Sequence, residues 1–157
     1  MEAGELSAIL VGRRVTDRQL AGNSFSIWLD TEKGRLTGWT VWLEPTWNLI
    51  GPDGVIAGSR QAQDEEEETG WQAVTDAIDI LIGQVLEALD IDPRTGDLVV
   101  TFSGGLVART FVSDPREDFL WRVRELGTDR CVVGGARQAS SNRPSQPAPL
   151  SGEETQS

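Results

Sequence analysis

Two stretches of this chain repeat the same order of sequence signals, and that repetition limits the possible folds more than any other feature. In each stretch a glycine follows an apolar pair, two strand-like segments come next, and a tryptophan begins a later apolar segment. The matched segments are 10–15 with 81–86, 24–28 with 98–102, and 47–49 with 121–123. Internal similarity of this kind indicates a duplicated structural unit. We therefore predict two pseudo-repeats, about residues 6–58 and 78–133.

Each pseudo-repeat is predicted to hold a short helix followed by an antiparallel set of about five short strands. Short apolar segments alternate with turn signals such as Lys33-Gly34 and Gly104-Gly105. The expected strands are 13–20, 24–30, 36–43, 46–50 and 55–57, and then 84–91, 97–103, 106–112, 119–124 and 130–133. Antiparallel strands with helices segregated to one side define the α+β class. We predict one compact, mostly-β α+β domain.

A helix is expected directly before the second set of strands. Apolar residues recur there at helical spacing, while Asp76 and Asp79 fall on the opposite face. Gly83 is well placed to end this helix, and a shorter helical turn that ends at Gly12 precedes the first set. The apolar positions of the longer helix are Trp71, Val74, Ile78, Leu81, Ile82 and Val85.

The chain divides into one domain and a tail. Residues 1–136 carry the strand and helix signals, with an acidic connector at about 59–70 between the pseudo-repeats. Residues 137–157 are rich in Ser, Gln, Pro, Ala and Glu and contain one leucine, Leu150. Such a segment cannot bury enough apolar surface to offset the entropy lost on ordering. We predict that 137–157 is disordered.

The residue types that are missing exclude several enzyme classes. The chain has no histidine, which rules out Ser-His-Asp and Cys-His catalysis and disfavours a zinc site. No Gly-rich loop is followed by Lys and Ser or Thr, so no phosphate-binding loop is expected. Paired carboxylates could serve a glycosidase, but an acidic chain brings some carboxylates together by chance. We therefore expect no catalysis, no cofactor and no metal.

Charge is concentrated in the middle of the chain. The net charge is −11, and residues 61–108 hold eleven acids and one base. This balance disfavours binding to nucleic acid or to anionic membranes and favours a basic protein partner. A solvated connector and an exposed helix face explain the same charges without any partner. The candidate partner-binding residues are Asp64, Glu65, Glu66, Glu67, Glu68, Asp76 and Asp79.

Trp39 and Trp42 are candidate aromatic anchors. They lie three residues apart, so a regular strand places them on opposite faces of its sheet. One is then expected in the core, and the other is either exposed or covered by another element. This arrangement leaves open a different function, that of a small ligand-binding or regulatory domain with a tryptophan-lined pocket between the two repeats.

Several of these segments resemble a family of small uncharacterised bacterial proteins, some of which look like immunity proteins of toxin systems. The segments that carry the resemblance are 10–15, 47–54, 83–85, 96–102 and 119–121. The resemblance implies an α+β fold and a binding protein without catalysis, and it offers no catalytic motif. With no apolar run long enough to span a membrane and no basic leader, we expect a cytoplasmic protein. The leading hypothesis is an immunity-like or antitoxin-like protein that neutralises a basic partner, such as a toxin, through its acidic surface.

Overall fold

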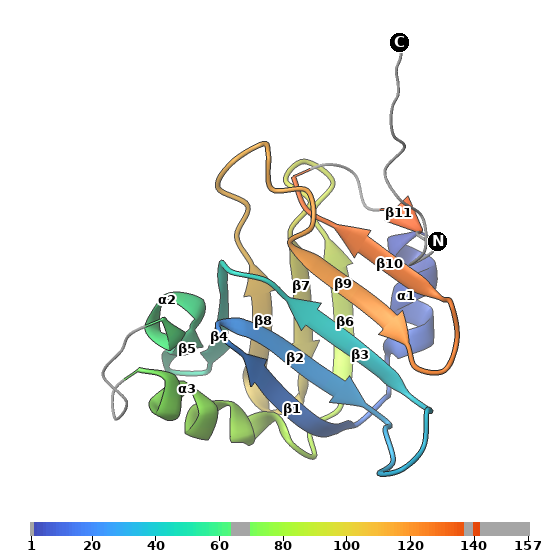
Figure 1. Ribbon diagram of the computed structural model, residues 1–157, viewed down its shortest axis with the longest axis horizontal. Helices are drawn as coiled ribbons and strands as arrows, with labels where there is room; N and C mark the ends of the chain where they lie inside the picture. The colour runs from blue at the N-terminus through green and yellow to red at the C-terminus, as the bar shows by residue number, and fades with distance from the viewer. Residues whose placement is uncertain (1, 64–69, 137–139, 142–157) are drawn as a thin grey trace.

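The computed structural model describes residues 2–63, 70–136 and 140–141, and in this part of the chain eleven strands form two antiparallel sheets (Figure 1). The helical elements are α1 (Ala3–Leu10), α2 (Ser59–Ala62), α3 (Trp71–Ala77) and the 3-10 turns η1 (Ile78–Leu81) and η2 (Ser103–Gly105). The first five strands are β1 (Val15–Ala21), β2 (Ser24–Leu29), β3 (Trp39–Leu43), β4 (Trp47–Gly51) and β5 (Gly54–Gly58). The others are β6 (Leu86–Ile91), β7 (Leu98–Phe102), β8 (Leu106–Thr110), β9 (Trp121–Glu125), β10 (Cys131–Gly134) and β11 (Ser140–Ser141).

The strand order confirms the α+β fold with two pseudo-repeats. One sheet has six strands in the order β1-β2-β3-β9-β10-β11, and the other has five in the order β6-β7-β8-β4-β5. Each repeat keeps its first three strands together and sends its last two strands to the sheet of the other repeat. The strand set of a repeat is therefore divided between the sheets, and two interlocked repeats form one domain (Figure 1).

The two sheets join where β1 and β6 begin. Equivalent hydrogen bonds run there from the first repeat to the second and from the second to the first. The amide of Gly12 donates to Leu86 O, and the amide of Gly83 donates to Val15 O, each with an N···O distance of 2.8 Å. Between them, Arg14 and Val85 form an isolated antiparallel bridge. Both glycines have φ near +90°, a conformation that is readily adopted only without a Cβ. Gly12 and Gly83 therefore occupy equivalent turns, one before β1 and one before β6.

Between the sheets lies a core of inward-facing side chains, and two tryptophans occupy equivalent places in it. Trp47 and Trp121 each begin the first exchanged strand of their repeat, and each is almost fully buried. The indole N–H of Trp47 donates to Asn23 O at an N···O distance of 2.7 Å, and that of Trp121 donates to Gly96 O at 2.8 Å. Because each acceptor lies in the hairpin before a repeat's second strand, each tryptophan ties an exchanged strand to that hairpin.

The helices differ in part from the expected ones. The helix that starts at Trp71 passes into η1 and stops at Leu81, and Val85 belongs to the β1–β6 junction rather than to the helix. Asp76 and Asp79 are exposed, as predicted. Trp71 is 41% exposed and donates its indole N–H to Gly22 O, so the prediction that it lies on the buried helix face is wrong.

Two predicted segments fall largely outside the described residues. The acidic connector at 59–70 begins with helix α2, and the run 64–69 is not described. Of the tail 137–157, the structure describes only Ser140 and Ser141, which pair with Val133 and Val132 of β10. No helix in the described part of the chain is long and apolar enough to cross a membrane.

Candidate functional site: an aromatic and arginine pocket

The tryptophans Trp39 and Trp42 lie on opposite faces of β3, as the sequence predicts. Trp39 is 2% exposed and faces the core, and the guanidinium groups of Arg13 and Arg130, which are not buried, lie 5.9 and 5.2 Å from its ring centre. Trp42 points outward and is half-buried. Trp42 is therefore the tryptophan of this pair that a partner could reach.

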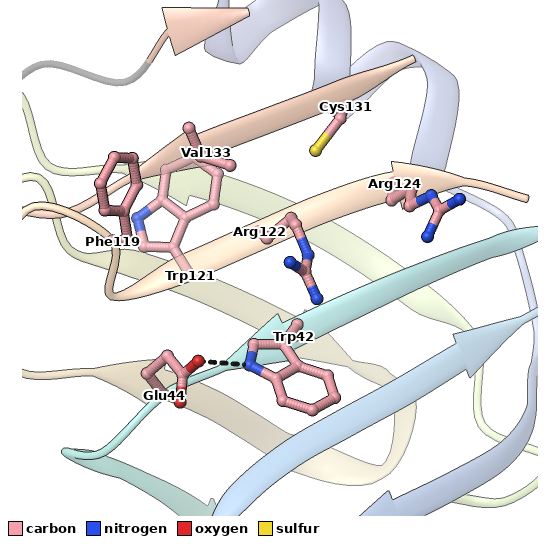
Figure 2. Close-up of a pocket in the computed structure, with 8 residues that line it drawn as sticks. All are labelled: Trp42, Glu44, Phe119, Trp121, Arg122, Arg124, Cys131 and Val133. Carbon is pink, nitrogen blue, oxygen red and sulfur yellow. Dashed lines mark hydrogen bonds between the residues drawn. The ribbon is translucent and has the colours of Figure 1, made fainter. Parts of the chain in front are cut away.

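Trp42 lines a pocket of about 240 Å³ on the outward face of the six-stranded sheet (Figure 2). The pocket spans the seam between β3 of the first repeat and β9 and β10 of the second, because β3 and β9 are paired neighbours. Phe119 stands at its rim and is 70% exposed. The lining residues are Trp42, Glu44, Phe119, Trp121, Arg122, Arg124, Cys131 and Val133. The ligand-binding domain with a tryptophan-lined pocket between the repeats stays a prediction; the pocket described here lies on one sheet face, where β3 of the first repeat pairs with β9 of the second.

Glu44 holds the Trp42 side chain in one orientation. The indole N–H of Trp42 donates to Glu44 Oε2 over 2.8 Å (Figure 2), and the other carboxylate oxygen accepts from the Ser24 hydroxyl. On the same face, the Arg122 guanidinium lies 5.4 Å from the centre of the Trp42 ring. This distance is within the range of a cation–π contact, which is worth about 0.5–1 kcal/mol at exposed sites. The pocket wall is thus ordered before any partner arrives.

Arg122 and Arg124 give the pocket its positive charge. Both are exposed, and among the described residues neither makes an ion pair or donates a side-chain hydrogen bond. Their charges act on Cys131 beside them. Burial raises the pKa of the Cys131 thiol, and the two guanidinium groups partly oppose that shift. The one carboxylate in the pocket, Glu44, already accepts two hydrogen bonds.

The outward residues differ between the two repeats although the inward ones match. By strand position, Arg122 of β9 corresponds to Asn48 of β4, and Trp42 of β3 corresponds to Arg109 of β8. Arg109 bonds to Asn48 and lies over Phe111, so its guanidinium has contacts on the protein itself. The fold therefore does not require the Trp42–Arg122 pair on an outward sheet face, and the pocket that this pair lines is a feature of the six-stranded sheet.

The predicted acidic site is only partly described. Residues 64–68 lie outside the described part of the chain. Asp79 forms an ion pair with Arg18 of β1, and Asp76 accepts from Gln72 Nε2 over 3.0 Å. The structure does not bring Asp76 or Asp79 to the pocket. Because Asp79 is paired with Arg18, its charge is less available to a basic partner.

Asp92, also in the acidic segment, is engaged in a turn. It accepts hydrogen bonds from the backbone N–H groups of Arg94 and Thr95. The bond from Arg94 is the main reason that its pKa is lowered. Asp97 similarly accepts from the Thr110 hydroxyl and the Val112 amide. Some of the carboxylates in 61–108 therefore stabilise the local fold through hydrogen bonds.

The lining residues determine what the pocket can contact. The described residues contain no group of three or more Cys, Asp or Glu side chains placed to hold a metal ion. The pocket offers a flat indole, an exposed phenyl ring and two guanidinium donors, which together recognise planar, apolar and anionic groups.

Sequence reasoning missed Arg122, Arg124, Phe119 and Glu44 as site residues. The signal was present in the order Trp121-Arg122-Val123-Arg124, which puts two arginines on the outward face of a strand whose inward face is apolar. No family model, no curated protein and no solved structure matches this chain. The resemblance to a family of small bacterial proteins stays a prediction.

Proposed function

We propose that this chain is a non-catalytic binding protein that recognises its partner through the pocket between β3, β9 and β10. The observation that carries the proposal is an outward-facing Trp42, fixed by Glu44, beside two arginines that have no anionic partner among the described residues. Blocking a partner in the manner of an immunity protein is one form that this function would take.

The residue types in the pocket support strong contact over a small area. Tryptophan and arginine are the residues most enriched at the energetic centres of protein interfaces. Because Trp42 is held by Glu44 and lies against Arg122, its side chain loses little freedom when a partner binds. Six of the eight lining residues lie in β3, β9 and β10, which pair as antiparallel neighbours, so most of the site is formed on a rigid element.

The test is selection of a random peptide library on the folded protein, with counter-selection on a Trp42→Ala variant. Peptides that bind the wild type and not the variant support the proposal. Arg60→Ala is the matched control for the arginine variants used below, because Arg60 is exposed on α2, away from the pocket. If every selected peptide binds wild type and Trp42→Ala equally, the pocket is not the recognition site and the proposal fails.

A second candidate is the acidic surface, which would bind a basic partner. Asp76, Glu87 and Asp90 favour it because they are exposed and make no ion pair within the described residues. A lysine-rich peptide is the probe for this candidate. Its binding should weaken as salt rises and should be unaffected by Trp42→Ala, whereas no salt-dependent binding would eliminate this candidate.

A further inference from the structure

We infer that the occupant of the pocket is an acidic peptide segment of a partner protein, with an apolar side chain next to its carboxylate. This inference rests on the proposed binding function and adds the chemistry of the partner. The carboxylate would lie against Arg122 and Arg124, and the apolar side chain would lie against Trp42 and Phe119. The partner expected from the net charge of −11 was basic, so the described pocket selects the opposite sign.

The positive charge of the pocket favours an anionic occupant. Arg122 and Arg124 occupy alternate positions of β9, so both project from the same face of the sheet. The nearest pocket carboxylate, that of Glu44, accepts from the Trp42 indole and the Ser24 hydroxyl and makes no ion pair with either arginine. The two guanidinium groups therefore offer donors in a planar fork geometry that matches a carboxylate.

The distribution of charge removes the main objection to an acidic partner. A net charge of −11 repels anions at long range, but residues 61–108 account for almost all of it. The six acids of this segment that the structure describes lie on α3, η1, β6 and the turn between β6 and β7, and none of them lines the pocket on the six-stranded sheet. Repulsion between exposed charges is screened beyond about 8 Å at physiological salt. Short contacts at Arg122 and Arg124 can therefore dominate.

The size and setting of the pocket favour a peptide over a small molecule. Its volume of about 240 Å³ lies below the range of roughly 300–1,000 Å³ that is typical of sites that enclose a small ligand. It opens on the face of a sheet, and Phe119 stands exposed at its rim. A segment that lies across the face can place one or two side chains in such a depression and continue over the rim.

The test uses the peptides selected on the wild-type protein and lost on Trp42→Ala. We expect them to be enriched in Asp and Glu beside an aromatic or large aliphatic residue. A fluorescein-labelled selected peptide should bind about tenfold more tightly than the same peptide with Asn and Gln in place of its acids. A factor of ten corresponds to about 1.4 kcal/mol, which a single charge-assisted hydrogen bond to a guanidinium group can supply.

The arginine variants supply the decisive comparison. The double variant Arg122→Ala and Arg124→Ala should bind the acidic and amide peptides with equal affinity, whereas Arg60→Ala should keep the tenfold preference. Both replaced arginines are exposed, and unchanged thermal unfolding would confirm that the variant is folded. Pocket-dependent peptides without acid enrichment would overturn this inference and leave the binding function standing. If phenylacetate displaces the labelled peptide at the peptide's own dissociation constant, the pocket holds a small carboxylate and the peptide inference is wrong.

Discussion

Replacing Gly134 with alanine would place a methyl group against the indole that forms one end of the pocket. A Cβ at this position would overlap Cζ2 of Trp121 and would lie 2.6 Å from Cε2, where carbon atoms normally approach to about 3.5–4 Å. Trp121 cannot move aside easily, because it is 1% exposed and its N–H is bonded to Gly96 O. Overpacking of this kind lowers the free energy of unfolding by about 1–3 kcal/mol.

Urea denaturation measures this cost directly. With a slope of about 2 kcal/mol per molar urea, the unfolding midpoint of Gly134→Ala should fall by roughly 0.5–1.5 M. Gly58→Ala is the matched control: Gly58 is also in a strand with extended backbone, and its added Cβ would meet nothing closer than Trp47 O at 3.5 Å. Gly58 is also the N-cap of α2, where alanine is less favourable than glycine. This cost opposes the gain from reduced freedom of the unfolded chain, so the variant should stay within about 1 kcal/mol of the wild type.

A second background tests the physical cause of the Gly134→Ala effect. Phenylalanine at position 121 lacks the Cζ2 atom, so Gly134→Ala should cost much less in a Trp121→Phe protein than in the wild type. The difference between the two costs is the interaction energy between the sites, and about 1 kcal/mol or more is expected. If Gly134→Ala is as stable as Gly58→Ala, or if its cost is the same in both backgrounds, the overlap is not the cause and the reasoning fails.

Two further predictions concern charge. Because burial raises the pKa of the Cys131 thiol, less thiolate is present at a given pH, so alkylation by iodoacetamide should be slower than that of free cysteine at pH 8 and should still rise above pH 9. A rate that levels off by pH 8.5 would contradict this. Replacing the acids of 64–68 and Asp76 with amides should slow association of a lysine-rich peptide and flatten its salt dependence in stopped-flow measurements. Asp79 is left unchanged there because it pairs with Arg18, and identical salt slopes for the two proteins would show that these acids do not steer binding.

The local elements and the internal duplication could be predicted from the order of the amino acids. The spacing of Trp39 and Trp42 predicted that they lie on opposite faces of β3, because successive residues in a strand point to opposite faces. The glycines Gly12 and Gly83 marked equivalent turns, because only glycine adopts φ near +90° readily. Helical periodicity extended too far, to Val85, because an apolar residue at helical spacing can also begin a strand.

Which strands share a sheet, and hence which residues line the pocket, depends on the packing of the whole domain. A strand with one buried face has the same alternation in either sheet, so the sequence does not reveal that β4–β5 and β9–β10 change places between repeats. That exchange pairs β3 with β9 in a register that sets Trp42 opposite Arg122. Residues far apart in the chain thus meet on one face, because strand pairing is fixed by the burial of all the inward side chains together and not by any local signal.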